Sequence, residues 1–428
     1  MGLTQDVSSC LLKVVCLSSC GRSSSLNASP VPDVSDVHPK PTLQHTEIRT
    51  SMVRSNPLRD SATPLRAAIV VEQTLGHVTY GQNLLAVLDD HSMLVPSFIF
   101  VPYEMPKWAA HIPGYSNWTV RSGIRARRAI REHLRHSEID VMFVHTHVPA
   151  LLLGRSMRRI PTVVSLDATS EQYDRLGVHY AHATASPFIE RWKKRAAKRC
   201  FARAKHIVAW SDWVKDGLIN GYEVDPARIT VIGPGVNIQQ WKRDDSYRDD
   251  TLVRVLFVGG DHHRKGAPLL IEAARRLRAD SSVPAFEVHL VTTSGIEPET
   301  GLIVHNGMKP NSPELIALYH SSHVFCLPTL ADCLPMVLCE AGVGGLAVIA
   351  TDVGAIREIV VDEHTGLLVE PTVDAVETAL RRVISDPELR TRLGASAEKL
   401  VRSRFDARAN GLRLGQILVD VGSPVAAS

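Results

Sequence analysis

The chain has 428 residues, of which 44% are hydrophobic and 22% charged, and its formal net charge is +3. This composition is typical of a globular protein long enough to form two domains, each with its own core. The small net charge argues against a strongly basic nucleic-acid-binding protein, although it leaves a local basic face open. No apolar run approaches the ~20 residues of a membrane span, and Lys13 interrupts the best N-terminal run, so we expect no signal peptide.

The cysteines indicate a reducing compartment. None of the seven has the Cys-x-x-Cys or metal-ligand spacing of a zinc or redox site. Most lie in apolar strand or helix context, so we interpret them as reduced core thiols of a cytoplasmic protein. They are Cys10, Cys16, Cys20, Cys200, Cys326, Cys333 and Cys339.

The first half of the chain alternates between strand and helix patterns. Residues 1–62 are rich in Ser, Pro, Asp and Thr without periodicity, and we predict a disordered leader there. Strands are expected at 67–71, 97–101, 141–144, 162–166, 206–210 and 229–232. Helices are expected through 84–88, over 123–136 and over 188–204, with Ser211 as the N-cap of another. This alternation predicts a domain with a parallel sheet over 63–235.

A second series follows a change in composition at Gly233-Pro234-Gly235, where we place a domain boundary. Strands are expected at 253–258, 286–292, 323–327, 346–350 and, as an edge strand, 365–369. Helices are expected over 267–279, 312–321, 336–344, 372–386 and about 388–421. The fold class is therefore α/β, with a second parallel-sheet domain over 236–405.

Two carboxylates, Asp332 and Glu340, flank the predicted start of a helix, with seven residues between them. Pro335 suits the first turn, because its ring presets φ and its missing N–H would be unpaired there in any case. Asp332 is then expected just outside the helix and Glu340 inside it. Free N–H groups at such a helix start face the carboxyl ends of parallel strands, where α/β sheets bind phosphorylated ligands.

A second motif, Gly259-Gly260-Asp261-His262-His263-Arg264-Lys265-Gly266, leaves one strand and enters the next helix. Glycines let the backbone approach an anion, and two adjacent cations can neutralise a diphosphate. The motif matches neither the dinucleotide-binding nor the P-loop fingerprint. Together with Glu340 as a partner for ribose hydroxyls and Asp332 for sugar hydroxyls, it predicts a nucleotide-sugar ligand.

Each of these residues also has a structural interpretation. Glu340 fits a solvated helix position, and Arg264-Lys265 fits a plain helix start. His262 and His263 are more often exposed loop residues than catalysts. His145 and His147, at the end of a strand, are more often structural histidines.

These segments together resemble retaining glycosyltransferases of the GT-B fold, specifically family 4, over residues 65–420. Phe257 to Gly266 resembles the phosphate loop of that family, and Asp332 to Glu340 its Glu-x7-Glu motif. Gly354 and Glu358 continue the second motif. The resemblance implies two Rossmann-like domains facing across a cleft, with residues 406–428 forming a helix that crosses back to the first domain.

The resemblance also implies roles for individual residues. Asp332, Lys265 and Arg264 are the expected catalytic residues, with the two cations serving the donor phosphates in place of a metal ion. Donor binding is expected at Gly259, Gly260, Cys333, Leu334, Pro335, Met336, Val337 and Glu340. Gly76, His77, His145 and Asp167 are expected on the acceptor side. No cofactor is implied beyond the nucleotide-sugar, and acceptors of the family are sugars, lipids or small molecules.

Three positions depart from the family pattern. Asp332 stands where Glu is usual, which shortens the side chain by one methylene. Gly260 occupies a position that is often Arg, so Arg264 is the expected substitute. Asp167 follows the strand after which many members carry a His, and we expect it to contact the acceptor instead.

Basic residues cluster on two predicted helices, which are usually solvated faces but also fit an anionic acceptor or the inner face of a membrane. They are Arg121, Arg125, Arg127, Arg128, Arg131, Arg135, Arg191, Lys193, Lys194, Arg195, Lys198 and Arg199. Nucleic acid is not expected, because aromatic residues do not interleave with the basic ones. A nucleotide-sugar epimerase and a non-catalytic nucleotide- or glycan-binding protein of the same fold are the alternatives.

Overall fold

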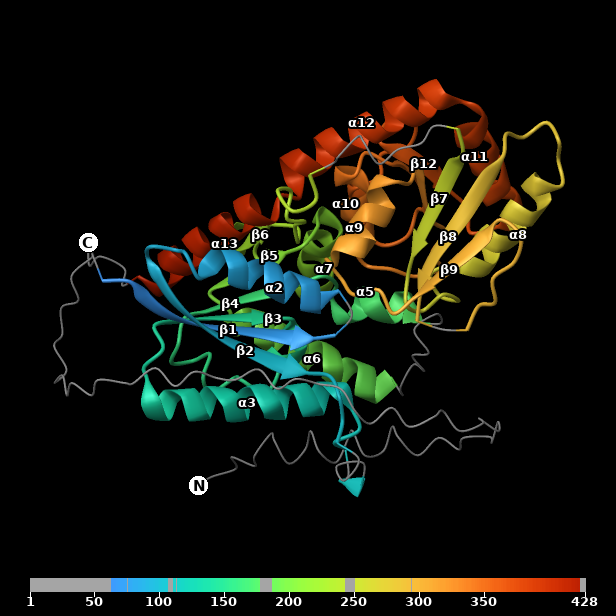
Figure 1. Ribbon diagram of the computed structural model, residues 1–428. Coiled ribbons are helices and arrows are strands. Elements are labelled where there is room, and N and C mark those ends of the chain that lie inside the picture. Colours follow the sequence, from blue (N-terminus) through green and yellow to red (C-terminus); the bar gives the residue numbers. More distant parts are fainter. Residues whose placement is uncertain are drawn as a thin grey trace, which may run out of the picture. The chain divides into compact units, whose positions relative to one another are not determined.

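The computed structural model describes residues 63–74, 76–106, 111–112, 114–177, 187–242, 251–293 and 295–423, and the predicted leader lies outside these ranges. Residues 64–428 form one compact unit. Its described part contains two six-stranded sheets, each with helices on both faces (Figure 1). Every strand pair in both sheets is parallel, which confirms the predicted fold class.

The first sheet has the strand order β2-β1-β3-β4-β5-β6. Its strands are β1 (Leu65–Gln73), β2 (Leu94–Pro102), β3 (Val141–His145), β4 (Thr162–Leu166), β5 (His206–Ala209) and β6 (Ile229–Val231). β3 and β4 are buried along their whole length, as expected for central strands covered on both faces.

Helices cover both faces of this sheet. α2 (His77–Leu88) lies on one face together with the C-terminal helix α13 (Ala407–Gly422). The other face carries α3 (Trp118–His136), α4 (His147–Ala150), α5 (Ser170–Arg175), α6 (Pro187–Arg203) and α7 (Asp212–Tyr222). The direction of the strand order reverses after β2, and right-handed crossovers therefore place α2 and α3 on opposite faces. Ser211 is the N-cap of α7, as predicted, and its side chain accepts a hydrogen bond from Val214 N.

The second sheet has the order β12-β11-β10-β7-β8-β9. Its strands are β7 (Val253–Val258), β8 (Phe286–Thr292), β9 (Leu302–Asn306), β10 (Val324–Leu327), β11 (Ala347–Thr351) and β12 (Gly366–Val369). α8 (Ala267–Arg278) and α11 (Val373–Ser385) pack together on one face. α9 (Pro313–His320), α10 (Met336–Val343) and α12 (Pro387–Arg404) complete the unit, with α10 packed against α12.

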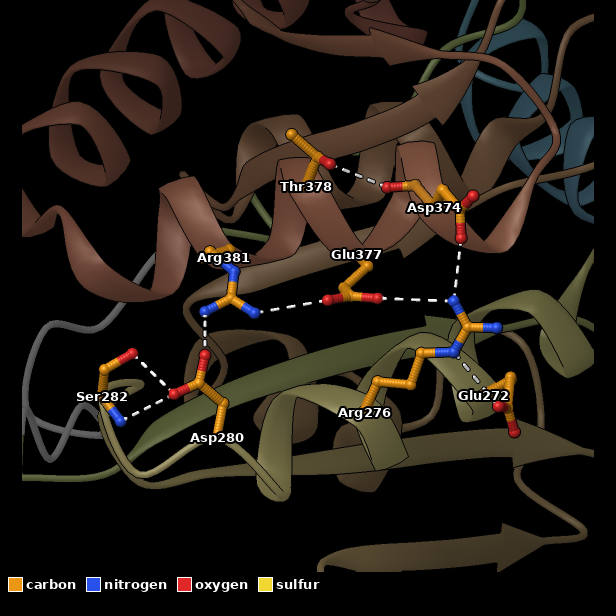
Figure 2. A network of polar contacts seen from close by, with 8 residues as sticks. All are labelled: Glu272, Arg276, Asp280, Ser282, Asp374, Glu377, Thr378 and Arg381. Carbon is orange, nitrogen blue, oxygen red and sulfur yellow. Dashed lines mark hydrogen bonds and ion pairs between the residues drawn. The ribbon is translucent and has the colours of Figure 1, made fainter.

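A network of ion pairs joins α8 to α11 (Figure 2). Arg276 of α8 binds Asp374 at 2.8 Å, and Arg381 of α11 binds Glu377 at 3.3 Å and also pairs with Asp280, just after α8. The hydroxyl of Ser282 donates to Asp280 at 2.7 Å. These exposed pairs fix the contact geometry of two helices whose apolar faces already pack together, and each pair alone contributes little to stability.

The end of the chain returns to the first sheet. α13 contacts α2, β3 and β4, and its Gly411 and Gly422 lie against Val87 and Val141. The chain passes from one sheet to the other twice, near Val236 and again near Phe405. Backbone hydrogen bonds link Val236 to Phe405 and Ala407 and so join these two segments near the predicted domain boundary.

Most strands and helices are confirmed to within one or two residues. β4, β7 and β8 begin and end at the predicted residues, and β12 is an edge strand as predicted. β9 was not predicted, because Leu302–Asn306 is short and carries a His and an Asn. Pro335 is the N-cap of α10 and thus one residue outside the predicted first turn, with ψ at 117°. No helix among the described residues is long and apolar enough to cross a membrane.

Candidate functional site

The loop between β10 and α10 places Asp332 beside Lys265, which lies in the loop that precedes α8. Asp332 is 8% exposed, and its Oδ2 pairs with the ammonium of Lys265. Arg264 lies farther away, with Nη1 3.9 Å from the same oxygen. The two predicted motifs, 67 residues apart in sequence, therefore meet at the carboxyl ends of β7 and β10.

Arg264 is mainly engaged in holding the loop. Its Nη1 donates to the carbonyl of Ala331 at 2.6 Å, and its Nε donates to Asp261 at 3.2 Å. Its own carbonyl accepts from the backbone N–H of Leu330 at 2.8 Å. A buried guanidinium with these partners fixes the backbone beside Asp332 and leaves Lys265 as the cation closest to the carboxylate.

Two glycines with positive φ allow the loop to pack closely. Gly266 has φ +81°, and a Cβ there would lie 1.9 Å from the carbonyl oxygen of Pro328. Gly354, with φ +58°, would place a Cβ 2.1 Å from the carbonyl oxygen of Asp332. Any side chain at either position would displace the loop that carries Asp332, so both positions require glycine.

Glu340 lies inside α10 and is buried, not solvated. Its Oε2 accepts a hydrogen bond of 2.9 Å from the hydroxyl of Tyr319, which is itself fully buried beneath Trp241. Burial raises the pKa of Glu340 to about 7, although the Tyr319 hydrogen bond opposes this shift. A carboxyl group of this kind changes charge near neutral pH.

The other predicted donor-binding residues surround this pair. Gly259 packs against the side chain of Lys265, and the carbonyl of the exposed Gly260 accepts from the hydroxyl of Thr293 at 3.1 Å. The remaining residues form the loop and first turn of α10, where all but the partly exposed Val337 are buried. They are Cys333, Leu334, Pro335, Met336 and Val337.

A second polar cluster occupies the carboxyl edge of the first sheet. His77 is the first residue of α2, and its Nδ1 lies 3.1 Å from Oε1 of Glu72 at the end of β1. Its Nε2 lies 3.4 Å from Oδ2 of Asp167, directly after β4. Burial alone would lower the pKa of His77, but Asp167 and Glu72 outweigh it and raise the pKa to about 10. Burial alone would raise the pKa of Asp167, but the charge of His77 and the hydrogen bond from its ring together lower this pKa to about 2.

His145 and His147 have the opposite character. Burial lowers the pKa of both, so both are neutral at neutral pH. His145 stacks on Trp210 with the ring centroids 4.7 Å apart, and neither of its ring nitrogens has a hydrogen-bond partner within the described ranges. His147 Nε2 lies 2.9 Å from the hydroxyl of Ser170. His145 also contacts the His77 ring edge-on at 4.5 Å, so it belongs to the predicted acceptor-side group.

The two clusters are neighbours. A Cβ built on Gly76 would lie 3.9 Å from Cγ of Met336, which places the start of α2 in contact with the start of α10. Burial raises the pKa of the Cys333 thiol, and the charge of Asp167 raises it further. The structure thus brings together all four predicted acceptor-side residues and the loop of Asp332.

Glu358 forms another contact between the two sheets. Its carboxylate accepts from the backbone N–H of Asp212 at 3.0 Å and of Trp213 at 2.9 Å, at the start of α7. The N–H of the nearby Ala355 donates to the carbonyl of Cys333 at 2.8 Å. The segment after β11 therefore links the donor loop to a helix of the first sheet.

Sequence reasoning missed Glu72 and Tyr319. Glu72 was detectable in principle as the single carboxylate of β1, directly after the apolar run 67–71. Tyr319 gave no signal, because its relation to Glu340 depends on how α9 packs against α10. No group of three or more His, Cys, Asp or Glu side chains that could hold a metal ion occurs among the described residues.

One basic residue was assigned wrongly. Arg121 is not part of a solvated face: it is 4% exposed and donates to the carbonyls of Tyr103, Tyr115 and Ser116. Its guanidinium also lies 5.2 Å from the ring centroid of Trp118. Helical spacing alone could not reveal this, because the carbonyls that Arg121 contacts belong to Tyr103, Tyr115 and Ser116, which precede α3 and lie outside the regular elements. Exposed cations of α3 and α6 include Arg128, Arg131, Arg135, Arg191, Lys194, Arg195, Lys198 and Arg199.

Solved structures define the class of this fold. Sucrose-phosphate synthase from Thermosynechococcus elongatus superposes with a TM-score of 0.63 at 16% identity, covering 82% of this chain and 98% of that one. Anabaena HepE in complex with UDP-glucose gives a TM-score of 0.60 at 14% identity, covering 83% of this chain and all of that one. The arrangement is the GT-B fold of nucleotide-sugar glycosyltransferases.

Sequence comparison gives the family. The family described as Glycosyltransferase Family 4 matches residues 96–240, and that described as Glycosyl transferases group 1 matches residues 239–400. The chain belongs to this family of glycosyltransferases, the group 1 or family 4 enzymes.

Curated relatives match the chain at low sequence identity. The chain is 24% identical to MMP alpha-(1->4)-mannosyltransferase of Mycolicibacterium hassiacum over 305 residues, which cover 68% of this chain and 72% of that protein. It is 29% identical to the D-inositol 3-phosphate glycosyltransferase of Gordonia bronchialis over 218 residues, covering 45% and 48%. The aligned region thus spans only about half of several relatives.

Proposed function

We propose that the chain transfers a hexosyl group from a nucleotide diphosphate sugar to a hydroxyl group of an acceptor, with retention of anomeric configuration. The observation that carries this proposal is the pairing of Lys265 with Asp332 at the carboxyl ends of β7 and β10, directly before the helix that contains Glu340. Ligands of open α/β sheets bind at this edge.

The donor-side roles follow from charge and position. Lys265 is the cation for the diphosphate, and the unpaired N–H groups at the start of α10 face the same anion. Glu340 accepts hydrogen bonds from the ribose hydroxyls, and Asp332 from the sugar hydroxyls. Arg264 acts by fixing the loop through Ala331 and by adding positive potential near the leaving phosphate.

The acceptor side is proposed at the cluster of His77, His145 and Asp167. Asp167 is the most accessible carboxylate there, with 24% of its side chain exposed against 5% for Glu72. An ionised carboxylate is a strong hydrogen-bond acceptor for a hydroxyl group. The names of the relatives, which refer to a mannosyltransferase and an inositol phosphate glycosyltransferase, support a carbohydrate or cyclitol acceptor.

The proposed reaction needs no protein nucleophile. The acceptor oxygen forms a bond to the anomeric carbon on the face from which the phosphate oxygen departs. The acceptor proton passes to that phosphate oxygen, and Lys265 stabilises the remaining charge. Removing one such stabilising donor typically costs about 3–4 kcal/mol of transition-state free energy.

A thermal-shift screen tests the donor site. UDP, GDP, ADP and their sugar conjugates are compared on the wild type, Lys265→Ala and Glu340→Ala. A ligand at about 100 times its dissociation constant adds ~2.7 kcal/mol of stability to the protein that binds it. We expect one nucleotide to stabilise the wild type and neither variant. The proposal fails if no nucleotide shifts the wild type, and the site assignment fails if both variants respond equally.

A peripheral membrane contact is the proposed use of the exposed cations on α3 and α6. Phe188, at the start of α6, is 63% exposed beside them, and an aromatic ring flanked by cations is typical of membrane-surface helices. Flotation with vesicles of neutral lipid, with and without phosphatidylglycerol, tests it. We expect binding only with the anionic lipid and its loss in a Lys194→Glu, Lys198→Glu variant. Equal recovery with both vesicle types would contradict it.

A further inference from the structure

Glu72 is a buried carboxylate with donors on both oxygens. Its Oε1 lies 3.1 Å from Nδ1 of His77 and accepts from the hydroxyl of Thr146 at 3.2 Å. Its Oε2 accepts from the indole N–H of Trp118 at 3.2 Å, and Thr74 lies 3.4 Å from Oε1. Only 4% of this residue is exposed, so the charge depends on these partners for its stabilisation.

The geometry around His77 fixes its protonation. Nδ1 faces the carboxylate of Glu72 at 3.1 Å and the hydroxyl of Thr74 at 3.0 Å, and Nε2 faces the carboxylate of Asp167 at 3.4 Å. The two carboxylates only accept, and the Thr74 hydroxyl can accept from Nδ1 while it donates to Oε1 of Glu72. This arrangement favours a proton on both ring nitrogens, which makes His77 an imidazolium. The titratable ring that packs against His77 is His145, whose lowered pKa leaves it neutral, and behind His145 lies Tyr80, whose pKa burial raises out of the physiological range.

An imidazolium without a free nitrogen cannot serve as a general base. Its remaining effect is on Asp167, whose carboxylate it holds by Nε2 while part of that side chain stays exposed. Asp167 also acts electrostatically on the Cys333 thiol of the donor loop. The carboxylate of Asp167 is therefore close enough to the donor loop to contact an acceptor bound beside it.

We propose that Glu72 is a positioning residue for the transfer reaction, keeping His77 doubly protonated so that His77 holds the Asp167 carboxylate toward the acceptor hydroxyl. This inference rests on the proposed function, because it assigns Asp167 to the acceptor. Glu72 itself touches neither substrate in this arrangement. The buried negative charge of Glu72 offsets the positive charge of His77. The remaining negative charge of these three residues therefore lies on Asp167.

A purely structural role for Glu72 makes a different prediction. The carboxylate joins β1, the start of α2, the start of α3 and residue 146, and any acceptor of hydrogen bonds could join them. Gln at position 72 keeps one such acceptor oxygen but removes the charge that stabilises the second proton of His77. The protonation of His77 therefore separates the two roles.

Nitrogen-15 NMR of the histidine side chains of the full chain gives the first measurement, with His77→Gln used to assign the resonance. In the wild type we expect both ring nitrogens of His77 to stay protonated to well above about pH 8. In Glu72→Gln, one proton should be lost at a pH lower by at least about one unit. Trp118→Phe is the matched control: it removes the partner of Oε2 but keeps the carboxylate, and it should shift the His77 titration much less than Glu72→Gln does.

Activity gives the second measurement, with release of UDP from UDP-glucose and water as the acceptor. We expect Glu72→Gln to lower kcat about tenfold and to leave KM for UDP-glucose within about twofold. Trp118→Phe should retain kcat if it folds, which circular dichroism reports.

Each outcome decides. A wild-type His77 that titrates near about pH 6.5 overturns the inference even if no variant folds. A changed His77 titration with unchanged kcat in Glu72→Gln also overturns it, since Glu72 would then be structural. If the wild type neither binds nor cleaves any nucleotide-sugar in the screen, the proposed function fails, and so does the inference built on it. If a nucleotide-sugar stabilises the wild type but His77 titrates at about pH 6.5, the inference fails and the proposed function still stands.

Discussion

The hydroxyl of Tyr319 donates a hydrogen bond of 2.9 Å to the carboxyl group of Glu340, and both side chains are buried behind the start of α10. Burial raises the pKa of Glu340 to about 7, and the Tyr319 hydrogen bond limits the rise. Glu340 is thus the donor-side group whose charge changes in the neutral range. An ionised carboxylate accepts two ribose hydroxyls better than a protonated one does.

The affinity for UDP-glucose should therefore increase as the pH rises from about 6 to 8, following ionisation of Glu340. The phosphodiester groups of this ligand remain ionised over that range, so the ligand adds no titration of its own. Isothermal titration calorimetry at several pH values measures the effect. Glu340→Gln should bind more weakly at every pH and without this pH dependence.

Tyr319→Phe removes the hydrogen bond that lowers the pKa of Glu340, so the affinity curve should move to higher pH. A curve that keeps the wild-type midpoint would show that Tyr319 does not control this carboxyl group. The same calorimetry, run beside the wild type, measures the midpoint.

Glu340 also makes the stability of the fold depend on pH. Because its pKa is raised from 4.5 to about 7, its contribution is most favourable below the unfolded value and is lost as the pH rises through about 7. Glu340→Gln should therefore be more stable relative to the wild type at about pH 8 than at about pH 4.5, by on the order of 3 kcal/mol. Urea unfolding at the two pH values checks this, and no difference between them would contradict the assignment.

Gly266→Ala should destabilise the chain far more than Gly307→Ala. Both positions have positive φ, +81° and +76°, so both variants pay the backbone penalty of about 1–2 kcal/mol. Only Gly266 would also drive a Cβ to 1.9 Å from a carbonyl oxygen, that of Pro328, whereas nothing lies within 4 Å at Gly307. Urea midpoints give the comparison, and equal losses would mean that the Pro328 contact is unimportant.

Replacing Glu358 by Ala should destabilise the contact between α7 and the segment after β11. The carboxylate accepts two backbone N–H groups at the start of α7, and loss of such a cap costs about 1–2 kcal/mol. Arg357→Ala is the control: this exposed residue forms a surface ion pair with Asp352, and its loss should leave the urea midpoint nearly unchanged. If the two variants behave alike, the cap does not contribute to stability.

Arg121→Met should be strongly destabilising, unlike Arg128→Ala on the same helix. Arg121 donates to three carbonyls, and hydrogen bonds to a charged group are worth about 1.5–3 kcal/mol each before compensation by water. A total loss of about 2–4 kcal/mol is expected, against almost none for the exposed Arg128. Thermal unfolding compares the stability of the two variants. A small loss of stability in Arg121→Met would mean that the hydrogen bonds of Arg121 contribute little, as expected for a solvated residue.

The regular alternation of strands and helices made the fold predictable from the sequence. Runs such as residues 255–258 are apolar throughout, because strands covered on both faces have no solvent side. The spacing of Asp332 and Glu340 likewise predicted a site, because a helix start beside a strand end needs only local sequence. β9, which is partly exposed beyond its first residue and has a polar end, lacked that signal.

Contacts between distant elements could not be predicted in this way. Glu72 and Asp167 contact His77 only because β1 and β4 end, and α2 begins, at the same edge of the sheet. The burial of Arg121 depends on a loop of irregular structure, and that of Glu340 on the packing of α9. Side-chain pairing across such distances is set by the fold as a whole, and a single sequence does not encode it in any local pattern.

The return of α13 to the first sheet affects how the protein can be made. Leu414 and Leu418, both buried, belong to the cover of a sheet whose own strands end at Val231. During synthesis on the ribosome, the part of that face that α2 does not cover stays exposed until nearly two hundred further residues have emerged. Stalled or prematurely terminated chains would expose that face to chaperones and proteases. The first sheet can therefore complete its folding only after the last helix has been translated.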